Sequence, residues 1–145
     1  MPSIKSELLL AQALPRRCVV CGRPPTHHLA VTCPRCTRLR SRSGSGKGRR
    51  TAALQASYNR ELEAFRCYYS RAPLDENPAS PWYISFDHRT PRDDSTVVVS
   101  ANMINHMKAN LTESEFRLTV VQLAEVFTGT RERVDTFQLS HWRRT

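Results

Sequence analysis

The sequence predicts an α+β protein in which a short cysteine-rich segment precedes a mixed region of helices and strands. Three observations predict this class. Four of the five cysteines lie within residues 18–36. Two stretches rich in aromatic and β-branched residues, 82–86 and 96–99, have the composition of strands. Apolar residues recur with helical spacing before and after these stretches. With 145 residues, 39% of them apolar, the chain has room for one compact unit and a small appendage.

The four clustered cysteines form two Cys-x-x-Cys pairs separated by eleven residues: Cys18, Cys21, Cys33 and Cys36. Each pair can form a tight turn whose backbone N–H groups stabilise thiolates, and four thiolates suit tetrahedral Zn²⁺. Two disulfides or a redox dithiol are the alternatives, disfavoured by a reducing compartment and by the presence of two pairs. His27 and His28 could replace a cysteine, but four thiolates already complete the site. We therefore expect a structural zinc site that supplies folding energy to this segment.

The positive charge is concentrated near the N-terminus. Residues 1–50 hold eleven Lys and Arg and one acidic residue, whereas residues 51–145 hold eleven basic and twelve acidic residues. Such a basic block is typical of a protein that binds a polyanion, nucleic acid above all. A solvated tail and an anionic membrane surface are the alternatives, and no amphipathic apolar face supports the membrane. The side chains expected to contact nucleic acid here are Arg38, Arg40, Arg42, Lys47, Arg49 and Arg50.

Composition divides the chain into a zinc-binding segment (1–37), a basic linker (38–50) and a larger domain (51–145). The linker is rich in Arg, Ser and Gly and has no apolar period. Its glycines resemble a phosphate-binding loop, but Lys47 is followed by glycine and no strand precedes it, so nucleotide hydrolysis is disfavoured. The chain has neither a convincing signal peptide nor a run of roughly 20 apolar residues. A cytoplasmic location is therefore expected.

The first half of the larger domain predicts a helix over residues 51–70. One face of it would carry Leu54, Tyr58, Leu62, Phe65 and Tyr69. Cys67, the fifth cysteine, is expected to be a small core residue on this helix. Prolines then predict a loop before the strand at residues 82–86.

The second half predicts a turn at residues 90–95, a buried strand at 96–99 and a short helix at 101–110. Thr112, with a glutamate three residues later, predicts a capping box that opens a further helix ending at Gly129. Its apolar face would carry Phe116, Val120, Leu123, Ala124 and Phe127. Three apolar residues of the last segment, 130–145, are expected to dock: Phe137, Leu139 and Trp142.

The residues best suited to catalysis lie at the end of the first strand and on the short helix. Asp87 and His88 end the first strand, and the helix carries Asn105 and Lys108. A carboxylate and an amide oxygen are hard ligands that suit Mg²⁺ or Mn²⁺, and a nearby imidazole can take a proton from water. This set predicts metal-assisted phosphodiester hydrolysis. Alternatively, the histidine and aspartate are plain turn residues and the helical pair faces solvent.

Residues 62–116 resemble the HNH endonucleases, also called His-Me finger or ββα-metal nucleases. That family has a strand ending in Asp-His or His-His, a proline-containing loop, a second strand and a helix that opens with Cys-Asn-x-x-Lys or a relative of it. Ile104 stands here where many members have the cysteine. The matching stretches are Asp87-His88-Arg89-Thr90-Pro91, Ile104-Asn105-His106-Met107-Lys108 and, upstream, Phe65-Arg66-Cys67-Tyr68-Tyr69-Ser70. The resemblance implies a helix-flanked ββα-metal core behind a four-cysteine zinc ribbon.

The resemblance also implies roles for individual residues. His88 would be the general base, while Asp87 and Asn105 would hold one divalent ion, Mg²⁺ or Mn²⁺, that stabilises the leaving 3′ oxygen. Lys108, Arg89 and Arg92 would contact phosphate or support the site.

Two departures from the family pattern concern neighbouring residues. The asparagine that orients the family's loop is replaced by Thr96, with Asp94 nearby. His106 is a rival to Asn105 as metal ligand.

The sequence therefore predicts a metal-dependent HNH endonuclease that binds duplex DNA and not a membrane. A non-catalytic zinc-ribbon adaptor for nucleic acid is the alternative, and it explains the charge and the cysteines equally well. A zinc-stabilised module for an acidic protein partner is a third hypothesis. A larger nucleic-acid-processing complex is also compatible with the sequence. The target sequence and the oligomeric state are not determined by it.

Overall fold

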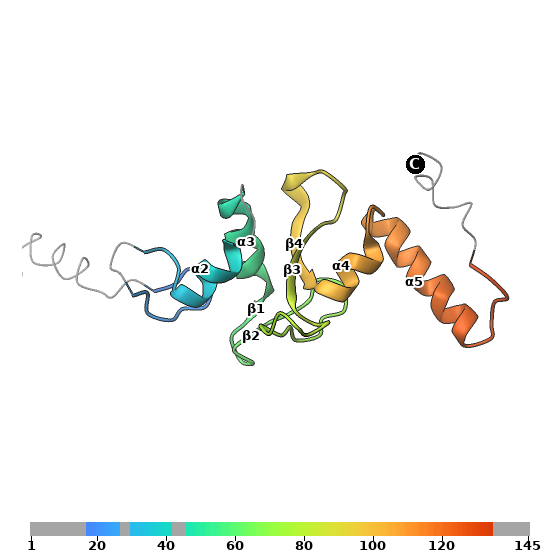
Figure 1. The fold of residues 1–145 in the computed structure, drawn as a ribbon, viewed down its shortest axis with the longest axis horizontal. Helices are drawn as coiled ribbons and strands as arrows, with labels where there is room; N and C mark the ends of the chain where they lie inside the picture. Colours follow the sequence, from blue (N-terminus) through green and yellow to red (C-terminus); the bar gives the residue numbers. More distant parts are fainter. Residues whose placement is uncertain (1–16, 27–29, 42–45, 135–145) are drawn as a thin grey trace, which may run out of the picture.

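A computed structural model describes residues 17–26, 30–41 and 46–134. It is a mixed α/β structure with two small antiparallel sheets, as the fold class predicts at this level (Figure 1). The elements are, in chain order, α2 (Pro34–Arg40), α3 (Lys47–Ser57), β1 (Tyr58–Asn59), β2 (Ala64–Phe65), β3 (Ile84–His88), the 3₁₀-helix η1 (Asp94–Thr96), β4 (Val97–Ala101), α4 (Asn102–Lys108) and α5 (Glu113–Phe127).

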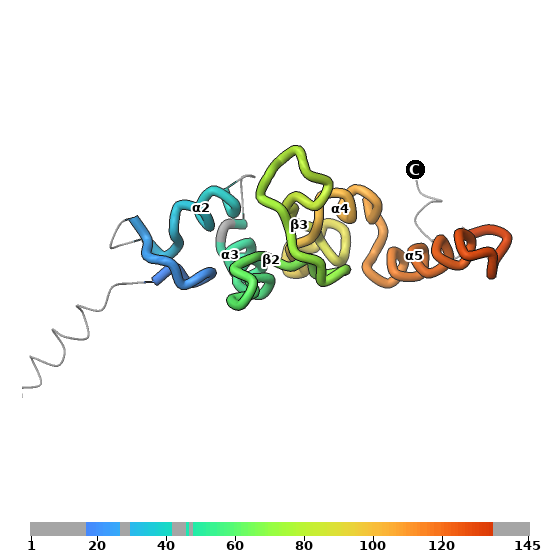
Figure 2. The backbone as a smooth tube through the Cα atoms, turned by 90° about the horizontal axis from the view of Figure 1, so that it is seen from below, coloured from blue at the N-terminus to red at the C-terminus, as the bar shows by residue number. Residues whose placement is uncertain are grey.

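The centre of the molecule is the β3–β4 hairpin. The two strands are antiparallel, with Ile84 opposite Ala101 and His88 opposite Val97. Because side chains alternate along a strand, Phe86 and His88 share one face and Ser85 and Asp87 the other. Helix α3 lies on the first face, where the Arg50 guanidinium is 5.4 Å from the Phe86 ring centre. Helix α4 lies on the second face, so the hairpin is enclosed between two helices (Figures 1 and 2).

The buried side chains form one cluster that runs through the described parts of the chain. It includes Cys36 and Leu39 of the cysteine segment, Leu54 of α3, Val99 of β4 and Phe116 of α5. The cysteine segment therefore packs into the same core as the hairpin. The prediction that Cys67 is a small core residue is confirmed, since its side chain is fully buried in this cluster.

The helix predicted over residues 51–70 is wrong beyond Ser57. Helix α3 ends there, and β1 and β2 form a short antiparallel pair in which Tyr58 lies opposite Phe65. Their rings meet edge to face with centroids 5.2 Å apart. A regular helix would have stacked these side chains on its own surface, whereas the hairpin places Phe65 in the core. The spacing of the apolar residues suits both structures, and tertiary burial selects the hairpin.

The stretch predicted as a basic linker is largely helical where it is described. Residues 38–40 complete α2, and 47–50 form the first turn of α3. Lysine and arginine have good helix propensity, and Pro34 at the start of α2 fixes a helical φ. The composition of this stretch lacks an apolar period and so predicts a linker, but Leu39 and Cys36 are buried and anchor α2 in the core.

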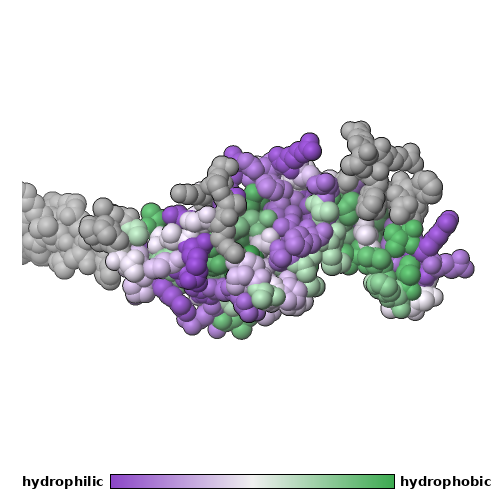
Figure 3. All heavy atoms as spheres, viewed as in Figure 1, coloured by the Kyte–Doolittle hydropathy of each residue, from purple (hydrophilic) through white to green (hydrophobic). Residues whose placement is uncertain are grey.

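Helix α5 begins with the predicted capping box. Thr112 Oγ1 accepts from the Glu115 N–H, and the Glu115 carboxylate accepts from the Thr112 N–H. After the helix, Gly129 has φ +77°, a conformation that favours glycine. Of the predicted apolar face, Phe116 is buried but Phe127 is 83% exposed. Figure 3 shows hydrophobic residues gathered over this end of the molecule.

Three sequence predictions lie outside the described residues: those for Arg42, for His27 and His28, and for the docked segment with Phe137, Leu139 and Trp142. Among the described helices, none has the length and apolar character that crossing a membrane requires.

Candidate functional site

The four paired cysteines come together in space. Their Sγ atoms all lie within 4.8 Å of one another, and those of Cys21 and Cys33 are 3.5 Å apart. Cys18, Cys33 and Cys36 are buried and Cys21 is half-buried. This arrangement places four thiols where they could hold a single metal ion, as the spacing predicts.

Local backbone geometry builds each half of the cluster. In the first half, the Gly22 N–H donates to Cys18 O at 2.8 Å, and Gly22 takes a positive φ of +74° that glycine adopts without strain. In the second half, Cys33 is the residue before α2 and Cys36 lies in its first turn. The sequence places a turn and a helix start where each pair needs to bend, so the ligand positions follow from local structure.

Burial and backbone donors act in opposite directions on these thiols. Burial raises the pKa of Cys18, but hydrogen bonds from the backbone of Cys21, Cys33 and Val20 and from the Cys21 side chain together more than offset it, and the pKa falls to about 6. Burial raises the pKa of Cys21 and of Cys36. A divalent cation at the cluster would offset this desolvation and favour thiolates. The donor set suits Zn²⁺, whose structural sites are closed shells of cysteine and histidine.

Arg35 connects the cysteine segment to the rest of the molecule through side-chain contacts. Its Nε donates to Glu76 Oε1 at 2.6 Å, and its guanidinium lies 5.1 Å from the Phe65 ring centre. Its Nη2 also donates to Glu63 O. The cysteine cluster is therefore held in a fixed position beside the β1–β2 hairpin.

A second group of polar side chains surrounds the end of β3. The His88 ring is 40% exposed, and its Nε2 lies 2.9 Å from Asp94 Oδ1. The other oxygen of Asp94 lies 3.1 Å from Arg49 Nη1. These residues line a recess of about 170 Å³ together with Arg50 and Phe86. Because an ionised carboxylate can only accept, Nε2 is the donor in this pair, and in the neutral imidazole Nδ1 then has a free lone pair.

Thr96 holds the loop between the strands. Its Oγ1 accepts from the Thr90 N–H at 3.1 Å and donates to Asp93 O at 2.7 Å. The Asp93 side chain in turn accepts from the Ser95 N–H. Thr96 thus fixes the loop, and Asp94 holds the histidine.

Asp87 lies on the opposite face of the hairpin and is buried. Its Oδ2 accepts from the Tyr69 hydroxyl at 2.6 Å, and its Oδ1 lies 3.4 Å from Lys108 Nζ. Lys108 Nζ also donates to His88 O at 2.6 Å. Burial, together with the Asp87 carboxylate, raises the pKa of Tyr69, so its hydroxyl keeps the proton that it donates.

Asn105 faces the hairpin, whereas His106 is exposed. The Asn105 Nδ2 donates to Ser85 Oγ at 2.7 Å and to Phe86 O at 3.3 Å. Asn105 and Asp87 therefore share the α4 face of the hairpin, and His88 lies on the α3 face. Sequence reasoning placed Asp87 and His88 side by side at a strand end. Because the strand continues through His88, their side chains alternate.

The basic residues predicted to contact nucleic acid fall in different environments. Arg49 and Arg50 line the His88 recess, Arg38 is exposed beside Glu76, and Arg40 is half-buried. Arg89 lies 3.8 Å from Glu113 on the rim of the loop. Lys47 begins α3.

Lys108 requires a correction as a phosphate contact. Its side chain is 1% exposed and its Nζ points into the molecule toward Asp87 and His88 O, so it supports the site from below.

Two site residues were missed in the sequence. The apolar spacing predicts Tyr69 on a helix face, and Ser85 belongs to no motif in the sequence. The role of Tyr69 could not be read from its neighbours in the sequence, because its contact with Asp87 joins residues 18 positions apart.

Comparisons of the chain with protein-family models, with curated proteins and with solved structures return no match. The resemblance of residues 62–116 to the HNH endonucleases therefore stays a prediction from motifs.

Proposed function

We propose that this protein is a zinc-stabilised, metal-dependent endonuclease of the HNH type that hydrolyses phosphodiester bonds in DNA. The observation that carries the proposal is the His88–Asp94 pair, which lies half-exposed in a recess lined by Arg49 and Arg50. A histidine oriented by a carboxylate beside two cations is suited to activate water against a phosphate. The order of hairpin and helix around it supports the same proposal.

His88 would act as the general base. Asp94 accepts from Nε2, which fixes the tautomer and leaves Nδ1 to take a proton from the attacking water. The imidazolium that forms would be stabilised by the Asp94 carboxylate. Arg49 would hold Asp94 in place and, with Arg50, attract the phosphate. Thr96 keeps the loop in this conformation.

The donor chemistry on the α4 face suits a divalent ion. Asp87 offers a carboxylate and Asn105 an amide oxygen, because the Asn105 nitrogen is used by Ser85 and Phe86. An ion there would share Asp87 with Tyr69 and Lys108. When bound, Mg²⁺ or Mn²⁺ would supply charge stabilisation for the leaving oxygen. Because Asp87 and His88 lie on opposite faces of the hairpin, the ion and the water at His88 would have to reach one phosphate around the end of β3, where His88 is the last residue.

A plasmid assay tests the proposal. Supercoiled DNA is incubated with the purified protein and Mg²⁺ or Mn²⁺, with an EDTA control. We expect nicking that falls by about 10²-fold or more in His88→Ala, since a general base contributes about 10²–10⁴ in rate. His106→Ala is the matched control, because it removes an exposed histidine on α4 and should keep full activity.

Binding measured in parallel separates the two hypotheses. A fluorescent duplex should bind His88→Ala and the native protein with the same affinity, and binding should weaken as salt rises. Equal binding with no metal-dependent nicking in the native protein would contradict the nuclease and favour the non-catalytic adaptor.

A further inference from the structure

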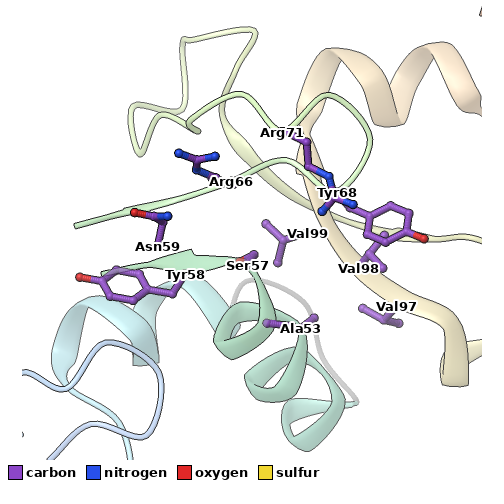
Figure 4. Close-up of a pocket in the computed structure, with 11 residues that line it drawn as sticks. Ala53, Ser57, Tyr58, Asn59, Arg66, Tyr68, Arg71, Val97, Val98 and Val99 are labelled. Atoms are coloured by element: carbon purple, nitrogen blue, oxygen red, sulfur yellow. The ribbon is translucent and has the colours of Figure 1, made fainter. Parts of the chain in front are cut away.

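A cavity of about 280 Å³ lies beside β4, on the outer edge of the hairpin, and Val97 is the one residue that it shares with the lining of the His88 recess. Figure 4 shows it between helix α3, strand β4 and the segment of residues 58–71. Its volume is close to the lower end of small-ligand pockets. No residue of the cavity belongs to the metal cluster or to the polar group around Asp87.

The lining of this cavity combines an apolar floor with a cationic rim. Ala53, Val97 and Val99 form one side, and Arg66 and Arg71 lie along the other (Figure 4). Both arginines are exposed, and the described lining contains no carboxylate. A ligand that fits must be flat or apolar at one end and anionic at the other. A nucleotide has this chemistry, because its base has apolar faces and its phosphate is charged.

The edge of β4 adds hydrogen-bonding groups. The Tyr68 N–H donates to Val99 O at 2.8 Å, which shows that the odd-numbered residues of β4 turn their backbone groups toward this side. The N–H and C=O of Val97 lie on the same edge. They can pair with the edge of a base, as a strand edge pairs with an added strand.

Arg71 is held in an unusual conformation at the rim. Its φ is +63°, a region in which residues other than glycine are strained. Its N–H donates to Cys67 O at 2.9 Å, and its guanidinium lies 5.7 Å from the Tyr68 ring centre. The Tyr68 hydroxyl donates to Glu113, which fixes that ring. The turn therefore sets the point on the rim from which the Arg71 side chain extends.

We propose that this cavity binds one unpaired nucleotide, with its phosphate on Arg66 and Arg71 and its base against Val97 and Val99. Val97 also lines the His88 recess, so the two sites are neighbours along one strand. The inference rests on the proposed function for its biological role: the nucleotide would belong to a strand whose backbone continues to His88. Nucleic acid with unpaired bases would then be preferred over a fully paired duplex.

The test is a titration of the ¹⁵N-labelled full chain with dAMP, deoxyadenosine and inorganic phosphate, without added magnesium. We expect dAMP to shift the amide signals of Tyr68 and Val98 and to bind at least tenfold more tightly than phosphate or the nucleoside. If inorganic phosphate bound as tightly as dAMP, the site would recognise only the phosphate group and not the base, which would overturn the proposal. Shifts confined to the His88 recess would also overturn it.

Arg71→Gly is the decisive variant. Glycine suits the positive φ, so this change removes the guanidinium without threatening the fold. We expect dAMP binding to weaken at least tenfold and the melting temperature not to fall. Ala56→Phe, which fills the cavity from an exposed position of α3, should abolish binding. Arg60→Ala, at the exposed turn between β1 and β2, is the control and should bind normally. Unchanged binding in Arg71→Gly would refute the site.

The two proposals fail separately. His88→Ala should bind dAMP like the native protein, because His88 lies outside the cavity. Nucleotide binding without any nicking would leave the cavity assignment standing and refute the nuclease. Nicking that depends on His88, with no nucleotide binding, would support the nuclease and refute the cavity assignment.

Discussion

The Lys108→Met substitution tests how much the buried contacts of Lys108 with the β3–β4 hairpin stabilise the protein. Lys108 is 1% exposed at its side chain and Asp87 5%, with Nζ and Oδ1 3.4 Å apart. Nζ also donates to His88 O at 2.6 Å. Methionine keeps much of the volume but leaves a buried carboxylate with the Tyr69 hydroxyl and a backbone carbonyl without its donor.

The size of the effect follows from that burial. Removing one partner of a buried ion pair costs about 3–5 kcal/mol, because the other charge stays desolvated. For a chain of this size, a loss of that order lowers the melting temperature by about 10–16 °C. The exposed pair of Arg117 and Glu113 on α5 is the matched control. Arg117→Met should cost about 0.5 kcal/mol or less.

Urea unfolding followed by circular dichroism measures both variants. The midpoint should fall strongly for Lys108→Met with an unchanged slope. The double variant Asp87→Asn with Lys108→Met removes both charges. Its loss in the free energy of unfolding should therefore be smaller, by about 1 kcal/mol or more, than the sum of the losses in the two single variants. A cost under about 1 kcal/mol for Lys108→Met, or strict additivity, would refute the view that this pair is a coupled buried unit.

Two further predictions concern the ends of the described fold. Cys33→Ser should lose bound zinc, as measured by elemental analysis. It should also lower the melting temperature of the full chain, because the cysteine segment shares its core with the hairpin. A full zinc content in the variant would contradict the site. Thr112→Ala should destabilise the protein by about 1 kcal/mol through loss of the capping box, measured by urea unfolding. Ser at the same position should restore most of that loss, and an equal loss in both variants would point to packing instead of capping.

The elements that the sequence predicted well are those set by near neighbours. The capping box of α5 joins residues three apart, and the strands near 82–86 and 96–99 follow from runs of β-branched and aromatic residues. The cysteine pairs are also local, since each needs one tight turn. Helix α3 and the hairpin after it were confused because apolar spacing alone suits both.

The sequence by itself determined the four cysteines that cluster, the strands and the helix around Asp87 and His88, and the concentration of positive charge in residues 1–50. Only the tertiary structure decided which faces these residues occupy. It buried Lys108 beneath Asp87, gave His88 its partner Asp94, and brought Arg71 to the rim of a cavity beside β4. Ligand spacing and capping depend on a few covalently linked residues, whereas burial depends on contacts between segments far apart in the chain, where packing outweighs local preference.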